Sequence, residues 1–130
     1  VEIGFANAQR VLSARLEIRF DPTVLEVKAL TVDVGANHIL RSTGADLIVS
    51  DQEFDNSAGY VIVGALGKQD GFDGVTGDGP FATIEFMAKT AIRSPVSLFI
   101  EDYEVYNYSE VGSPGPVLDG NVFVFEGEVR

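Results

Sequence analysis

The chain has 130 residues, of which 45% are hydrophobic, and its formal net charge at pH 7 is −11. This length suits one domain with a core of its own, over residues 1–130, and the apolar content argues against a disordered chain. The acidic balance argues against nucleic acids and anionic membranes as partners, because both attract basic surfaces.

The clearest element near the start is a strand with period-two alternation. Residues 12–20 alternate apolar and polar side chains over nine positions, which predicts a half-buried strand. We expect a short strand over residues 1–6 before it and another over residues 24–34 after the turn at Asp21-Pro22. The inward side of the alternating strand is predicted to hold Leu12, Ala14, Leu16, Ile18 and Phe20.

The rest of the chain also predicts strands. Residues 47–54 and 60–67 flank the turn residues Asp55 to Gly59 and predict a hairpin. Further strands are expected over residues 81–89, 97–108 and 121–129. No long stretch has the apolar spacing of a helix, and the longest apolar run, residues 61–67, is too short to cross a bilayer. The pattern indicates seven to nine strands in an all-β sandwich or jelly roll.

An acidic, glycine-rich stretch, KQDGFDGVTGDGPFATIEF over residues 68–86, raises the question of a metal or phosphate site. Asp70, Asp73 and Asp78 match no EF-hand spacing, and the stretch lacks the Gly-Lys-Ser/Thr of a phosphate loop. We therefore interpret it as a turn that leads into a strand. Residues 51–56 also carry alternate side-chain oxygens, which we interpret as a solvated strand face.

No catalytic arrangement is evident, and we predict that the chain is not an enzyme. Cysteine is absent, and the single histidine, His38, lies in a polar stretch where an exposed loop position is expected. No serine has a Gly-x-Ser-x-Gly context. Glu101, Asp102 and Glu104 lie among tyrosines, which suggests a sugar site, but the chain has no tryptophan.

Three segments resemble the cohesin family. They are LEIRFDPTVLEVKAL, GVTGDGPFATIEFMAK and LDGNVFV, in that order along the chain. The chain is similar over residues 1–129 to the cohesin module, the receptor domain of cellulosome scaffolds and related cell-surface proteins. In cohesins the Gly-Asp stretch is a structural connector, and the fold is related to the sandwich of carbohydrate-binding modules.

The resemblance implies an all-β, two-sheet β-sandwich with jelly-roll topology and about eight to nine strands. It implies a non-catalytic domain outside the cell or on its surface, which binds a dockerin on one exposed sheet face. No cofactor is expected on this chain, since dockerins carry their own calcium. In the family a strand precedes the one that matches residues 1–6. We expect it to be missing from this sequence, because the chain was trimmed or the strand is supplied otherwise, unless the alignment of the first residues is displaced by one strand.

By position, the resemblance places the binding face on three strands. Alternation independently points the side chains at 13, 15, 17 and 19 outward. If Ile62 and Leu66 face the core, Val63 and Ala65 face outward as an apolar centre, the alternative being burial on both sides. The expected partner-binding residues are Ser13, Arg15, Glu17, Arg19, Asp51, Phe54, Val63, Ala65 and Lys68.

One further departure from the family and two alternatives accompany this prediction. Cohesins of the best-known type often carry Asn and Asp where this chain has Ser13 and Arg15, so partner specificity is expected to differ. A carbohydrate-binding module would bind polysaccharide through exposed aromatic side chains, and Tyr103, Tyr106 and Tyr108 form the one candidate cluster. A structural or assembly domain of a larger surface protein is the other alternative.

Overall fold

The structure is a computed structural model, and it describes residues 1–89, 98–108, 114–116 and 122–126. The side chains that it describes lie in residues 1–89 and 98–106. Within this part the chain is all-β, as predicted, with one 3-10 turn and no helix long and apolar enough to cross a membrane.

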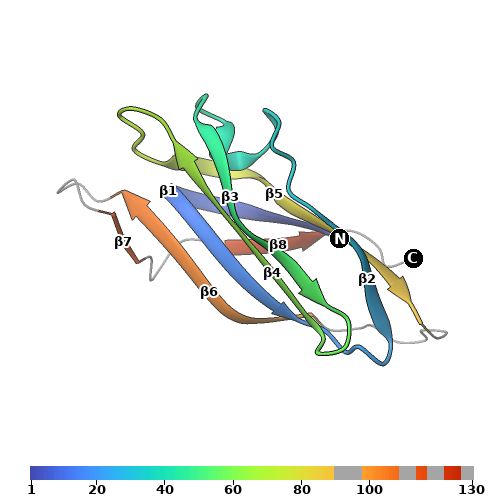
Figure 1. Ribbon diagram of the computed structural model, residues 1–130. Coiled ribbons are helices and arrows are strands. Elements are labelled where there is room, and N and C mark those ends of the chain that lie inside the picture. The colour runs from blue at the N-terminus through green and yellow to red at the C-terminus, as the bar shows by residue number, and fades with distance from the viewer. Residues whose placement is uncertain (90–97, 109–113, 117–121, 127–130) are drawn as a thin grey trace.

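Eight strands are described, but their lengths are unequal (Figure 1). Six of them have seven or more residues, β8 has five and β7 has three. The expectation of about eight to nine strands was therefore too high for strands of substantial length. The elements are β1 (Glu2–Arg19), β2 (Leu25–Thr31), η1 (Ile39–Arg41), β3 (Asp46–Asp55), β4 (Tyr60–Lys68), β5 (Val75–Ala88), β6 (Phe99–Tyr108), β7 (Pro114–Pro116) and β8 (Val122–Glu126).

Strand β1 explains both the lower count and the architecture. The two strands expected over residues 1–6 and 12–20 are one strand of 18 residues. Asn7 and Arg10 have φ values of 59° and 49°, and the pairing of β1 with β5 shifts register on either side of Ala8. β1 therefore continues through a bend that sequence periodicity does not reveal.

The two halves of β1 belong to opposite layers of one sheet that nearly closes on itself (Figure 1). Residues 2–11 pair with β5 and residues 2–6 with β8, while residues 13–19 pair with β4 and β6. We call β3, β4, β6 and residues 13–19 of β1 the front layer. We call β2, β5, β8 and residues 2–11 of β1 the back layer.

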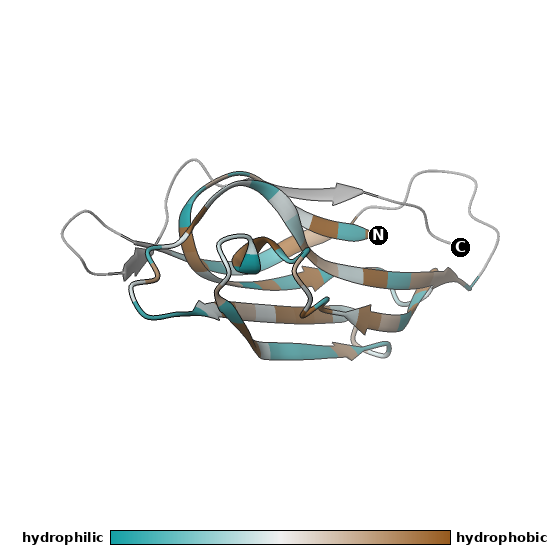
Figure 2. Cartoon of the chain, turned by 90° about the horizontal axis from the view of Figure 1, so that it is seen from above, coloured by the Kyte–Doolittle hydropathy of each residue, from teal (hydrophilic) through white to brown (hydrophobic). Residues whose placement is uncertain are grey.

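The core lies between these layers. Ala14, Leu16, Ile18 and Phe20 are buried, as the alternation predicts, but Leu12 is only half-buried. Val11 is fully buried instead, because the bend before the front-layer half of β1 changes which residue faces inward. Edge-to-face ring pairs join Phe5 to Phe81 within the back layer and Phe20 to Phe86 across the core, with centroids 5.9 and 5.4 Å apart. In Figure 2 the apolar segments of the strands alternate with hydrophilic ones, as expected for layers buried on one side.

His38 was expected on an exposed loop, and this expectation was wrong. Its side chain is 1% exposed and lies 5.1 Å from the Phe81 ring, centroid to centroid. Its Nδ1 accepts a hydrogen bond from the Leu40 N–H at 3.1 Å, which caps η1. Burial lowers the pKa of His38 to about 4, so the neutral imidazole is the form that the core holds at neutral pH.

The Asp-Gly stretch anchors the bend of β1. Arg10 pairs with Asp73 (Nη2 to Oδ2, 3.2 Å), and the Asn7 N–H donates to the Asp78 carboxylate at 2.7 Å. Gly74 has φ 93°, and a Cβ there would lie 2.2 Å from the Arg10 carbonyl oxygen, so glycine is required by both conformation and space. These carboxylates have separate structural contacts. The described residues contain no group of three or more His, Asp or Glu that could hold a metal ion.

Candidate functional site

The front-layer half of β1 presents one side to the core and one to the surroundings. Ser13, Arg15, Glu17 and Arg19 are only partly buried and alternate with the buried residues 14, 16 and 18. Their predicted outward orientation is confirmed. This alternation follows from the pleat, which sends successive side chains to opposite sides.

Strand β4 has the opposite orientation from the one expected. Val63 and Ala65 are 0% and 1% exposed and lie opposite Leu16 and Ala14, both core residues. The outward side of β4 carries Tyr60, Ile62, Gly64 and Leu66. The prediction of an exposed centre at Val63 and Ala65 was therefore wrong. Residues 61–66 are apolar or glycine throughout, so period two gives no orientation, and only the pairing with β1 decides it.

Strand β3 confirms the outward position of one expected residue and moves another off the face. Asp51 lies opposite Gly64 on the outward side, whereas Phe54 lies opposite Val61 on the core side. Phe54 remains 41% exposed because β3 is the edge strand of the sheet path. Glu53, opposite Ile62, is the outward neighbour of Asp51. The spacing of two residues between Asp51 and Glu53 is the signal from which the outward position of Glu53 could have been predicted.

Lys68 is exposed, but it lies apart from the other expected residues. It ends β4 opposite Asp46, beyond Leu66, the last residue of β4 that pairs with β1. It therefore borders the face formed by the four strands.

Strand β6 adds residues to this face that the sequence did not assign to it. Asp102, Glu104 and Tyr106 lie opposite Glu17, Arg15 and Ser13 of β1. All three are exposed. Nothing local in residues 99–106 indicates β1 as their neighbour, because this pairing spans most of the chain.

Together the four strands form one outward surface, which we call the front face. Pairing aligns its residues in rows that cross the sheet. One row has no charged residue, and we call it the apolar row. The other two rows hold charged residues, and we call them the arginine row and the acidic row. The apolar row holds Ile48, Leu66, Ser13 and Tyr106, the arginine row Asp51, Gly64, Arg15 and Glu104, and the acidic row Glu53, Ile62, Glu17 and Asp102.

A shallow depression lies at the centre of the front face. A Cβ at Gly64 would lie 2.8 Å from both the Ser50 Oγ and the Asp51 Oδ2, so the missing side chain makes room for these two polar groups. The depression has a volume of about 170 Å³, and Arg15, Leu66 and Tyr106 also line it. It combines hydrogen-bonding groups with apolar walls, as recognition sites do.

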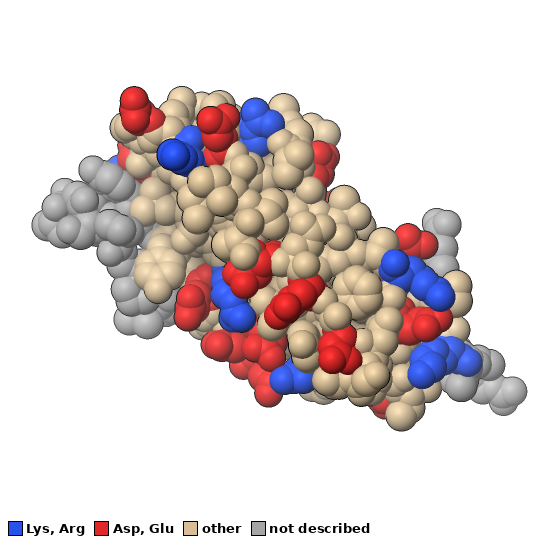
Figure 3. Space-filling model, viewed as in Figure 1, with Lys and Arg blue, Asp and Glu red and all other residues tan. Residues whose placement is uncertain are grey.

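Ion pairs organise the charged part of the front face. Arg15 Nε lies 3.6 Å from Asp51 Oδ2, and Arg19 Nη2 lies 3.0 Å from Glu17 Oε1. Arg19 also pairs with Glu101 and lies 5.2 Å from the centroid of the Tyr60 ring. Figure 3 shows acidic and basic side chains close together on this side of the molecule, beside a broad uncharged area.

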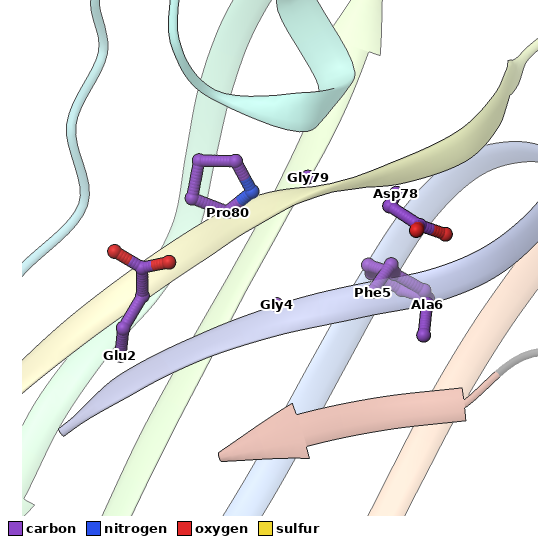
Figure 4. A pocket seen from close by; sticks show the side chains of 7 residues that line it. All are labelled: Glu2, Gly4, Phe5, Ala6, Asp78, Gly79 and Pro80. Carbon is purple, nitrogen blue, oxygen red and sulfur yellow. The ribbon is translucent and has the colours of Figure 1, made fainter. Parts of the chain in front are cut away.

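A second depression lies on the back layer between β1 and β5 (Figure 4). Gly4 and Gly79 approach closely there, since a Cβ on Gly4 would lie 2.7 Å from the Gly79 carbonyl oxygen. Its two carboxylates, Glu2 and Asp78, stand at opposite ends, and Asp78 already accepts the Asn7 N–H. This depression therefore lacks the convergent polar groups of the front face.

Comparison with known proteins gives one result. The family model described as Cohesin domain matches residues 1–112. No curated protein and no solved structure shows a significant match to the chain.

Proposed function

Since the chain belongs to the cohesin family, a family of non-catalytic protein-recognition domains, we propose that it binds a dockerin-like module through the front face. The family match over residues 1–112 is the observation that carries this proposal. The front face supports it, because it is a continuous surface across four strands whose outward side chains are polar, charged and apolar in turn. We also infer that the nearly closed sheet is the two-sheet, jelly-roll sandwich of that family.

We assign the apolar centre of the binding face to the apolar row, because Val63 and Ala65, which the sequence predicted for it, are buried. Ile48 and Tyr106 are 42% and 40% exposed, and Leu66 and Ser13 lie between them in the row. Burying large apolar side chains of this kind stabilises a complex, while charges around them select the partner. Arg15, Glu17 and Arg19 keep the selecting role that the sequence assigned to them, with Lys68 at the border.

The remaining parts of the proposal follow from the same family membership. We assign calcium to the partner and no cofactor to this chain. We place the domain outside the cell or on its surface. These assignments describe the conditions under which the front face would bind its partner.

Binding to a panel of calcium-loaded dockerin modules, measured by isothermal titration calorimetry, tests the proposal. At least one module is expected to bind, and Arg15→Glu is expected to abolish that binding because it places a third carboxylate beside Asp51 and Glu104. Lys28→Glu makes the same change of charge at an exposed position of β2 and serves as the control. Binding that survives Arg15→Glu unchanged would show that the face is wrongly assigned.

Carbohydrate binding has less support. Tyr106 lies opposite Ser13 on the front face, whereas Tyr103 lies opposite Leu16 on the other side of β6. The two rings therefore do not form one aromatic platform, and the Tyr108 side chain lies outside the described residues. Affinity electrophoresis in soluble glycans separates the two functions, and light scattering addresses the alternative of an assembly domain.

A further inference from the structure

A cleft lies where the segment between β2 and η1 meets the start of β1 and the middle of β5. Its volume is about 390 Å³. The His38 ring lines it, so we call it the His38 cleft. Its polar lining is Glu2, Asp33, Asn37 and Thr83, and its apolar wall includes Pro80 and Ala82. Glu2 and Pro80 also border the depression shown in Figure 4. None of these residues belongs to the front face.

The His38 ring has one nitrogen with a partner and one without. Because Nδ1 accepts the Leu40 N–H, the neutral ring carries its proton on Nε2. Burial lowers the pKa of His38 and outweighs the opposing effects of the nearby Phe81 backbone and the Asp33 carboxylate. Within the described residues, no group forms a hydrogen bond with the buried Nε2. Since η1 holds the Nδ1 end, the Nε2 end is the part of the ring that can face the cleft.

A buried donor without an acceptor is costly, so the Nε2–H of His38 indicates that an acceptor oxygen belongs in the cleft. A single water could supply that oxygen. A water molecule takes up about 30 Å³, however, and the cleft measures about 390 Å³. This volume falls within the range of about 300–1,000 Å³ that is usual for pockets that bind small molecules.

The lining residues restrict the chemistry of an occupant. A protonated Nε2 cannot ligate a metal ion, and an ammonium group has no oxygen to accept from it. An anion could accept from Nε2, but the carboxylates of Glu2 and Asp33 would repel it. A hydroxyl group meets both demands, because it accepts from Nε2–H and donates to a carboxylate.

We propose that the His38 cleft is a binding site for one residue of a neutral sugar. One hydroxyl accepts from His38 Nε2, neighbouring hydroxyls donate to Glu2 and Asp33, and Thr83 takes part in the same network. The apolar wall at Pro80 and Ala82 contacts the carbon skeleton of the sugar. This site is independent of partner binding by the front face and of the tyrosines of β6.

The single histidine of the chain makes the test direct, because its imidazole nitrogens give one set of signals in nuclear magnetic resonance spectra. The unaltered domain would be titrated at pH 7 with glucose, galactose, mannose and xylose, and with di- and trisaccharides built from them. At least one sugar is expected to shift the Nε2 signal saturably, with a dissociation constant below about 10 mM. The amides of Glu2, Asn37 and Thr83 should shift with the same dissociation constant. Monosaccharides and oligosaccharides are separate arms, which distinguish a free sugar from a residue of a glycan.

The double variant Glu2→Ala, Thr83→Val removes two polar groups that lie opposite each other in the β1–β5 pairing. Both positions are exposed, so the fold should be retained, and an unchanged His38 spectrum without sugar verifies this. The variant is expected to bind at least about tenfold more weakly. Glu85→Ala removes an exposed carboxylate of β5 that does not line the cleft, and should change affinity less than about twofold.

Three results would overturn the proposal. The first is the absence of a saturable change at His38 with any sugar up to about 50 mM, five times the expected limit. The second is sugar binding that shifts the amides of β6 and leaves His38 unaltered. The third is an equal, non-saturating response to every sugar and to glycerol, which would show that the cleft holds only solvent. Because none of these results involves a protein partner, dockerin binding by the front face is tested separately.

Discussion

The two sides of the β1–β4 pair share one backbone but differ in the burial and charge of their side chains. On the inner side Leu16 lies opposite Val63, and both are fully buried. On the outer side Arg15 lies opposite Gly64, and Arg15 reaches the depression at the centre of the front face. Core packing and the proposed partner binding therefore fall on alternate residues of the same strands, and a shift of one residue in register would exchange the buried and the outward set.

The largest effect is expected from truncating the inner side. Leu16→Ala should lower the free energy of unfolding by about 2–5 kcal/mol, because it leaves a cavity between the layers. Urea denaturation followed by circular dichroism measures this loss. A loss below 1 kcal/mol, on the order of a surface substitution, would show that the inner side is not the packed core described here.

The buried histidine makes the stability of the inner region dependent on pH. The pKa of His38 is lowered by burial to about 4, so its contribution to stability is complete above its usual value of 6.5 and is lost as the pH falls from 6.5 towards 4. The contribution is on the order of 3 kcal/mol.

The measurement is urea denaturation at pH 7, 5.5 and 4.5, compared with His38→Asn. Asparagine retains a side-chain acceptor for the Leu40 N–H but does not titrate in this range. The variant should therefore show a shallower fall in stability. An identical pH profile in both proteins would contradict the buried, neutral imidazole.

A polar substitution at Val63 tests the orientation of β4 directly. Val63→Thr conserves the shape of the side chain but buries a hydroxyl, and should cost about 1–3 kcal/mol. Ile48→Thr, on the 42% exposed side chain of the front face, is the matched control and should cost less than about 1 kcal/mol. Equal and small losses in the free energy of unfolding from both changes would show that Val63 is exposed, as the sequence analysis had expected.

The smallest effect on stability is expected from the outer side. Arg15→Ala removes a partly exposed ion pair with Asp51 and should change the free energy of unfolding by less than about 1 kcal/mol. The same substitution should weaken binding of a calcium-loaded dockerin, measured by calorimetry. A large loss of stability would show that Arg15 supports the fold and does not serve the partner.

Sequence periodicity predicted those elements whose two sides differ. The alternation over residues 13–19 is clear because one side is apolar and the other polar. The hairpin of β3 and β4 was predicted from its turn residues, and Asp55 accepts the backbone N–H groups of Ala58 and Ser57, which hold its pKa below the usual value. In both places the local sequence is sufficient to predict the structure.

The parts that the sequence did not reveal depend on contacts between distant segments. The bend of β1 is stabilised by Asp73, Gly74 and Asp78, which come much later in the chain. The burial of His38 depends on Phe81. The acids of β6 join the front face only because β6 pairs with β1, so they could be found only from the three-dimensional arrangement.

Chemical-shift mapping by nuclear magnetic resonance tests the central claim most directly. The backbone amides of the domain would be recorded with and without a calcium-loaded dockerin module that binds it. If the front face binds the partner, the largest changes are expected in residues 13–19, 46–55, 60–68 and 99–106, with β2 and residues 83–88 of β5 nearly unaffected. Changes concentrated on β2 and β5, with the front face unaltered, would contradict binding through the front face.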